Sequence, residues 1–242
     1  MATEVEAKFV IPDPSAFRRL KTRKRLAGFT LGERNVLRVQ DTYLDTKDRA
    51  LMTAGIACRV RRQSDGQLLL TLKAMNAATA AIHRRRELEI SLPADESGSK
   101  GIFKARAWPE GPLRARILQV VGRKRLTRLA TIRQRRTIRS VSKAGNTVAL
   151  LSLDDVQVRT GSGAERFSEI EVELTGRGGM GDLERLATCL EHEWGLRPDG
   201  PSKLERALAL AHARPRAPVP RKGRGIDPAD SVAEAERKVL RG

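Results

Sequence analysis

Charged residues spaced two positions apart constrain the fold of this chain more than any other feature of its sequence. Near the N-terminus, Glu4, Glu6 and Lys8 alternate with Val5 and Ala7. Residues two apart in a β-strand point to the same face, about 6.6–6.8 Å from each other. The alternation therefore predicts a strand with one apolar face and one charged face.

The same alternation recurs along much of the chain. Each of these segments places its apolar residues on one face and its charged residues on the other. The closely spaced charges are Arg59 and Arg61; Arg85, Glu87 and Glu89; Arg133 and Arg135; and Glu169, Glu171 and Glu173.

A sheet with one solvated face is the simpler interpretation of any one such strand. Like charges this close repel each other, however, and here they recur in strand after strand. Paired carboxylates suit hard cations such as Mg²⁺ or Mn²⁺, and paired arginines suit phosphate oxygens. A sheet that rolls closed with its charged faces inward would form a tunnel for a metal–phosphate ligand.

Alternation and helical periodicity together predict an α+β fold made mostly of antiparallel strands. The expected strands are residues 3–10, 37–44, 56–63, 67–74, 83–92, 129–140, 147–158 and 169–174. The expected helices are residues 15–26, 113–122, 182–194 and 202–213, with Ser15, Asp182 and Ser202 as N-caps in three of them.

Composition indicates the kind of partner. The formal net charge is +18, from 47 Lys and Arg against 29 Asp and Glu, so we expect affinity for polyanions. Aromatic residues make up only 3% of the chain, which argues against nucleic acid because single-strand binders stack bases on aromatic rings. Two distant cysteines and the lack of a long apolar segment favour a cytoplasmic protein without a membrane span.

Several motifs occur in a fixed order over residues 1–212. They are Glu4-Val5-Glu6-Ala7-Lys8, Tyr43-Leu44-Asp45-Thr46, Arg59-Val60-Arg61-Arg62, Thr71-Leu72-Lys73, Arg85-Arg86-Glu87-Leu88-Glu89, Arg133-Gln134-Arg135, Leu153-Asp154, Glu169-Ile170-Glu171-Val172-Glu173 and Pro201-Ser202-Lys203-Leu204-Glu205-Arg206. This set resembles the CYTH superfamily, the triphosphate tunnel metalloenzymes. The resemblance implies a closed antiparallel eight-stranded β-barrel with flanking helices.

Within that superfamily, the chain is most similar to bacterial inorganic triphosphatases that carry a CHAD domain behind the CYTH domain. The resemblance places the CYTH domain at residues 1–212. Residues 213–226 form a Pro/Arg-rich linker, and residues 227–242 are similar to the opening helix of a CHAD domain. It also implies hydrolysis of inorganic triphosphate to diphosphate and phosphate, and it leaves homodimer formation open.

The resemblance also implies roles for individual residues. Lys73 would contact the terminal phosphate, while Glu87 and Glu89 would orient the cations or a second metal. Mg²⁺ or Mn²⁺ would be held by Glu4, Glu6, Glu171 and Glu173, with Asp154 and Glu169 joining directly or through water. The triphosphate would be held by Lys8, Arg59, Arg61, Lys73, Arg85, Arg133, Arg135 and Lys203. Arg136 extends the cationic group, so the choice of inward arginine there depends on strand parity.

Three other functions remain open at this stage. Class IV adenylate cyclase and thiamine triphosphatase use the same fold, but their organic groups need an apolar or aromatic pocket. A non-catalytic polyphosphate-binding module would bind without turnover. A basic RNA-binding protein would show salt-sensitive RNA binding that does not depend on the carboxylates.

Overall fold

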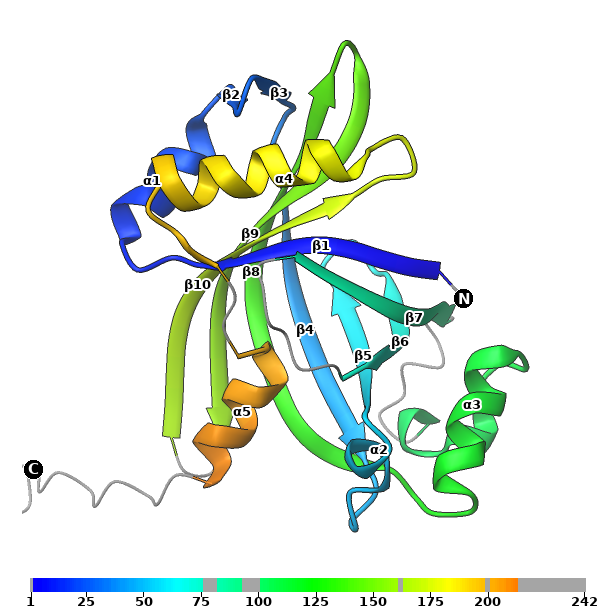
Figure 1. Cartoon of the computed structure of the whole chain (residues 1–242). Coiled ribbons are helices and arrows are strands. Elements are labelled where there is room, and N and C mark those ends of the chain that lie inside the picture. Colours follow the sequence, from blue (N-terminus) through cyan, green and yellow to red (C-terminus); the bar gives the residue numbers. More distant parts are fainter. Residues whose placement is uncertain (1, 76–81, 93–100, 161–162, 199–200, 213–242) are drawn as a thin grey trace, which may run out of the picture.

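A computed structural model describes residues 2–75, 82–92, 101–160, 163–198 and 201–212. Within these residues, eight antiparallel strands close into a barrel (Figure 1), which confirms the predicted fold class. The order around the barrel is β8-β4-β5-β6-β7-β1-β10-β9, and β9 pairs with β8 to close the ring. The barrel strands are β1 (Ala2–Val10), β4 (Asn35–Asp45), β5 (Ile56–Gln63), β6 (Leu68–Ala74), β7 (Ile82–Leu92), β8 (Thr127–Lys143), β9 (Asn146–Thr160) and β10 (Gly163–Leu174).

Three short strands extend the sheet outside the ring. β2 (Arg25–Leu26) pairs with β3 (Phe29–Leu31), which pairs with β8, and β11 (Arg197–Pro198) pairs with β1. A helix was predicted to continue to Leu26, but it ends at Thr22 and β2 follows. Ala27 and Gly28 have φ values of 51° and 81°, and this left-handed turn reverses the chain between β2 and β3.

Sharp turns set the register of the longest hairpin. Ala144 and Gly145, between β8 and β9, have φ values of 47° and 80°. A two-residue turn with both φ values positive matches the right-handed twist of the flanking strands. The predicted turn at this position is confirmed, although β8 and β9 extend beyond the predicted bounds.

The four predicted helices lie at the expected positions with corrections at their ends, whereas the short helix at Ala50–Thr53 was not predicted. Asp13, not Ser15, caps the first helix, because its side chain accepts a hydrogen bond from the Ser15 N–H at 2.8 Å. Asp182 lies inside the fourth helix rather than at its cap, and its side chain accepts from the Gly179 N–H. Ser202 caps the last helix as predicted. The helices are α1 (Pro14–Thr22), α2 (Ala50–Thr53), α3 (Pro112–Val121), α4 (Met180–Thr188) and α5 (Lys203–His212), with 3-10 turns at Gly101–Phe103 and Ala105–Ala107 and a π-helical turn at Cys189–Glu193.

Apolar side chains pack in three places around the barrel wall. α1 and α4 cover the outside of β1, β9 and β10, and α4 lies above β1 in Figure 1. α2 and α3 cover the outside of β5 and β6. The third cluster lies inside the barrel, where Leu204 and Ala207 of α5 pack against Tyr43, Ile132 and Val158. α5 therefore fills one end of the barrel with apolar side chains.

Both cysteines, Cys58 and Cys189, are buried and free, as expected of small core residues. Among the described residues, no helix is long and apolar enough to cross a membrane. The predicted linker and tail, residues 213–242, lie outside the described residues.

Candidate active site

The barrel encloses a cavity of about 550 Å³, lined by the inward faces of its strands. Strand register brings distant residues onto this common face: Lys8 lies opposite Glu171, and Arg59 lies opposite both Tyr43 and Thr71. The charged lining residues are Glu4, Glu6, Lys8, Arg59, Arg61, Lys73, Glu87, Glu89, Arg136, Glu171, Glu173 and Lys203.

Lys203, the first residue of α5, lies at the buried end of the cavity among three carboxylates. Its Nζ lies 3.0 Å from Asp154 Oδ2 and 2.9 Å from Glu171 Oε1, and it donates a hydrogen bond to Glu169. Burial would lower the pKa of Lys203, but the three carboxylates outweigh it and hold the pKa well above its usual value. Lys203 is therefore an internal counter-ion that joins α5 to β9 and β10.

Arg136 of β8 neutralises the same carboxylates from another side. Its Nε donates to Asp154 Oδ1 at 2.8 Å, and its Nη2 lies 2.6 Å from Asp154 Oδ2 and also contacts Glu171. Burial would raise the pKa of Glu171, but Lys203 and Arg136 hold it well below its usual value. These carboxylates are therefore ionised and paired within the protein.

A second carboxylate group surrounds Lys73 of β6. Lys73 Nζ lies 2.7 Å from Glu4 Oε2 and 3.3 Å from Glu87 Oε2. Burial and the neighbouring Glu4 raise the pKa of Glu173 to about 7. This part of the cavity therefore holds more negative charge than its own cations balance.

Arg59 and Arg61 of β5 enter the cavity beside a buried aspartate of β4. Arg61 donates from Nε and Nη2 to the two Asp41 oxygens at 2.8 and 2.9 Å, in a bidentate pair. Arg59 Nη2 donates to Thr71 Oγ1 at 3.3 Å, whereas Arg59 Nε is buried and has no hydrogen-bond partner within the described part of the chain. The sequence analysis did not single out Asp41, although it alternates with Val39 and Tyr43 in an inward-facing pattern.

Most of the predicted site residues converge on this cavity. Asp154 and Glu169 lie at its buried end, where they contact Lys203. Arg85 lies opposite Glu4 in the strand register, and its side chain is outside the described part of the structure. Those that line the cavity are Glu4, Glu6, Lys8, Arg59, Arg61, Lys73, Glu87, Glu89, Glu171, Glu173 and Lys203.

The predicted inward orientation of Arg133 and Arg135 is wrong. Both side chains are exposed on the outer wall, and Gln134 and Arg136 face inward instead. The prediction assumed that the apolar face of every strand lies outside the barrel. In β8 the apolar residues Ala130 and Ile132 face α5 inside the barrel, which reverses that relation.

The carboxylate chemistry fits a divalent cation, because Mg²⁺ and Mn²⁺ prefer oxygen ligands. Asp154, Glu169 and Glu171 each place one oxygen within 4.8 Å of the others. Lys203 already neutralises that group, whereas in the second region Glu4 and Glu87 share the ammonium group of Lys73 and leave negative charge uncompensated. A cation in the second region would offset this charge.

A closed barrel lined by interleaved acidic and basic side chains defines a triphosphate tunnel type of protein. A family model described as the CYTH domain matches residues 2–208, and the chain belongs to this family. No match was found among curated proteins.

Solved structures share the fold at low sequence identity. A putative adenylyl cyclase from Hippeastrum, described as having a dominant triphosphatase activity, has a TM-score of 0.66 and 20% identity, covering 85% of this chain and 95% of that chain. A putative adenylate cyclase from Bacillus halodurans has a TM-score of 0.56 and 18% identity, covering 85% and 98%. A protein from Pyrococcus horikoshii has a TM-score of 0.52 and 19% identity, covering 85% and 98%.

Proposed function

We propose that this chain hydrolyses inorganic triphosphate to diphosphate and phosphate, with Mg²⁺ or Mn²⁺ as cofactor. The observation that carries the proposal is that cations and carboxylates from distant strands line one shared cavity. Phosphoryl transfer depends mainly on positioning and charge stabilisation, and this lining offers both. The proposed hydrolysis therefore does not require a nucleophilic side chain of the protein.

The cations of the cavity would bind the phosphate oxygens. Arg59 supports this role most directly, because its buried Nε has no hydrogen-bond partner among the described residues. A buried donor without a partner is costly, and a phosphate oxygen would satisfy it. Arg61 is held in a fixed orientation by Asp41, while Lys8 approaches from β1.

Glu4, Glu6, Glu171 and Glu173 would hold the divalent cation, with Asp154 and Glu169 behind them. A bound cation would supply charge neutralisation and polarise the phosphoryl group. The protein itself keeps Asp154 and Glu171 ionised through Arg136 and Lys203.

Lys73 would contact the terminal phosphate, because it lines the cavity and carries a positive charge. Glu4 and Glu87 hold its ammonium group at the cavity wall. Glu87 would fix the position of Lys73. Glu89 accepts a hydrogen bond from Thr71 at 2.8 Å and lies 3.9 Å from Arg59, so it would orient that guanidinium.

A second cavity gives a specific reason to retain the organic substrates as an alternative. It has a volume of about 430 Å³, and its wall includes Ile56, Leu72 and Leu88. Lys73 and Glu87 line both cavities. Pro112, Arg116 and Gln119 of α3 complete its wall, so this cavity lies between α3 and the barrel strands, and a class IV adenylate cyclase or thiamine triphosphatase would need it to open onto the phosphate site.

A substrate panel tests the proposal directly. Phosphate release from triphosphate, ATP and thiamine triphosphate would be measured with Mg²⁺ and with Mn²⁺. We expect triphosphate to be hydrolysed fastest. Turnover of ATP or thiamine triphosphate alone would reverse the order of the two candidates, and binding without turnover under either metal would favour a polyphosphate-binding module.

The double variant Glu4→Gln with Glu6→Gln tests the carboxylate role. We expect metal-dependent turnover to fall by at least about 100-fold, because the cation loses two charged ligands. Thermal unfolding of the variant would show whether the barrel remains folded. Full activity in a folded variant would exclude the proposed metal site.

A further inference from the structure

The outer wall of the barrel carries a group of exposed arginines that the cavity does not use. We call Arg38, Arg62, Arg133, Arg135 and Arg166 the outer arginine face; they come from β4, β5, β8 and β10. Strand register places them together. Arg38 lies directly opposite Arg135, and Gln40 lies opposite both Arg62 and Arg133.

The packing of the helices leaves this part of the wall uncovered. The helices cover only parts of β5 and β10, because Arg62 near the end of β5 and Arg166 near the start of β10 are exposed. The outer arginine face instead lines an open hollow of about 520 Å³, shared with Gln40, Gln157 and Asp155. The arginines are therefore accessible to a large ligand.

The charges of this surface are only partly balanced, because the acidic residue among the described residues that line the hollow is Asp155, which lies opposite Arg135 on β9. None of the ion pairs between described residues involves Arg38, Arg133, Arg135 or Arg166. Two arginines directly opposite each other on neighbouring strands destabilise a sheet. Burial and the nearby Arg135 lower the pKa of Lys21 in α1, and Asp155 opposes this effect.

The side chains in the hollow define the chemistry of a ligand. Guanidinium groups bind phosphate oxygens through two parallel hydrogen bonds. The residues that line the hollow include no aromatic side chain on which a base could stack. The surface therefore suits a phosphate chain without bases better than single-stranded nucleic acid.

We propose that the outer arginine face is a second, non-catalytic site that binds linear inorganic polyphosphate. The choice of this polyanion rests on the proposed function, in which the cavity acts on the same class of compound. The surface charge and its exposure stand independently of that function.

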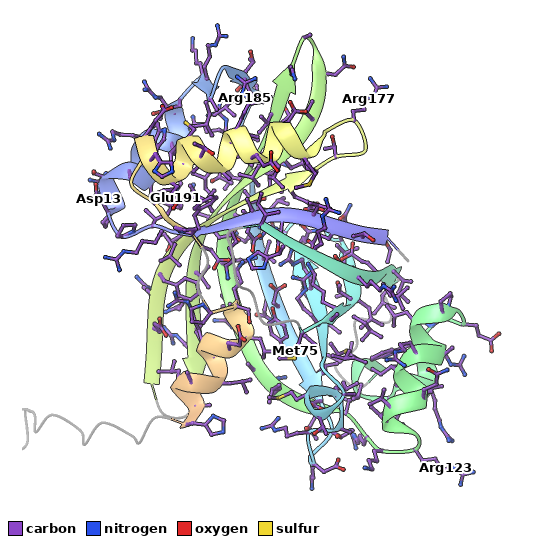
Figure 2. All side chains as sticks on the ribbon, in the orientation of Figure 1. Asp13, Met75, Arg123, Arg177, Arg185 and Glu191 are labelled. Atoms are coloured by element: carbon purple, nitrogen blue, oxygen red, sulfur yellow. The ribbon has the colours of Figure 1, made fainter. Side chains whose placement is uncertain are left out.

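The test compares two double variants that remove the same charge from different exposed surfaces. Arg133→Gln with Arg135→Gln removes two members of the outer arginine face. Arg123→Gln with Arg125→Gln is the matched control, since both residues are exposed and Arg123 lies in the loop after α3 (Figure 2). Binding of fluorescently labelled inorganic polyphosphate to the full chain would be measured with a metal chelator present, at several salt concentrations.

We expect the first double variant to bind polyphosphate at least about tenfold more weakly, with a shallower dependence of log Kd on log salt. The control should bind within about twofold of the parent chain. Triphosphate turnover should be equal in both, because neither pair lines the cavity. Equal loss of binding in both variants, or none in the first, would overturn the proposal.

Competition separates the ligand classes. Unlabelled polyphosphate should displace the probe, whereas RNA duplex that displaces it equally well would overturn the assignment to polyphosphate. Failure of the outer site can be distinguished from failure of the proposed triphosphatase activity. A chain without triphosphatase activity whose binding still depends on Arg133 and Arg135 would retain the outer site and lose only the catalytic proposal.

Discussion

At the scale of single residues, the decisive contacts are buried ion pairs rather than hydrophobic ones. Lys203 is 6% exposed and contacts Asp154, Glu169 and Glu171. Taking charges out of water costs several kcal/mol per ion, and good pairing geometry is needed to offset it. The site is thus stable only while its charges remain matched.

Lys203→Met should destabilise the fold by about 3–5 kcal/mol, because three carboxylates lose a shared buried counter-ion. Divalent cation should then stabilise the variant more than it stabilises the parent chain, since a ligand that binds only the folded state raises stability. Urea unfolding with and without Mn²⁺ measures both effects.

Lys143→Met, which removes an exposed partner of Asp182, is the control and should cost no more than about 1 kcal/mol. Losses of equal size would contradict the counter-ion role.

Asp41 gives a prediction with a defined pH dependence. Burial would raise its pKa, but Arg61 and Arg59 hold the pKa well below the usual range. A depressed carboxyl pKa contributes stability above the unfolded-state value of about 3.9, and this contribution is lost as pH falls towards the folded-state value. The stability gap between the parent chain and Asp41→Asn should therefore be largest near neutral pH and shrink below about pH 4. Urea unfolding of both proteins at neutral pH and below about pH 4 measures this gap. A gap of the same size at the two pH values would contradict the prediction.

At the scale of elements, α5 determines which half of the barrel interior is apolar. Leu204 and Ala207 pack inside against Ile132, Val156 and Val158, while Lys203 begins the polar half. Because α5 brings both kinds of side chain, one helix sets the boundary between the core and the site. The orientation of β8 follows from the same packing.

Leu204→Ala should lower the free energy of unfolding by about 2–4 kcal/mol, because it leaves a cavity beneath α5. Leu208→Ala, at a partly buried position of the same helix, should cost less. Denaturant unfolding of the two variants compares them. A larger loss at Leu208 would mean that α5 packs on the barrel through a different face.

At the scale of the whole molecule, the family match and the three apolar clusters lie within residues 2–212. We propose that residues 1–212 form the CYTH domain, followed by a linker at 213–226 and a separate segment at 227–242. The net charge of +18 would then be shared between the barrel and this tail.

A chain that ends after His212 should unfold within about 0.5 kcal/mol of the full chain and hydrolyse triphosphate at the same rate. The reason is that the match to the CYTH family ends at residue 208, before that point. Thermal unfolding and phosphate release would measure the two properties. A large loss of stability would mean that the tail packs on the barrel.

Much of the barrel could be predicted from the sequence because strand alternation is a local property. The charged face of β1 and the carboxylates of β10 were placed correctly by parity alone, since the inward face of each strand there is polar and its outer face packs under helices. The ordered motifs then indicated the closed barrel. Local patterns of this kind are fixed by the period of the backbone.

The structure alone decided which face of β8 points inward and which carboxylates are already neutralised. Alternation distinguishes two faces of a strand but does not say which one meets the interior, and α5 makes the apolar face of β8 the inner one near Ile132. The pairings of Arg136 with Asp154 and of Lys203 with Glu169 join residues far apart in sequence. The sequence by itself determined the strands and the types of charge they carry. Only the tertiary structure decided their orientation and partners, because both depend on which segments pack against each other in three dimensions.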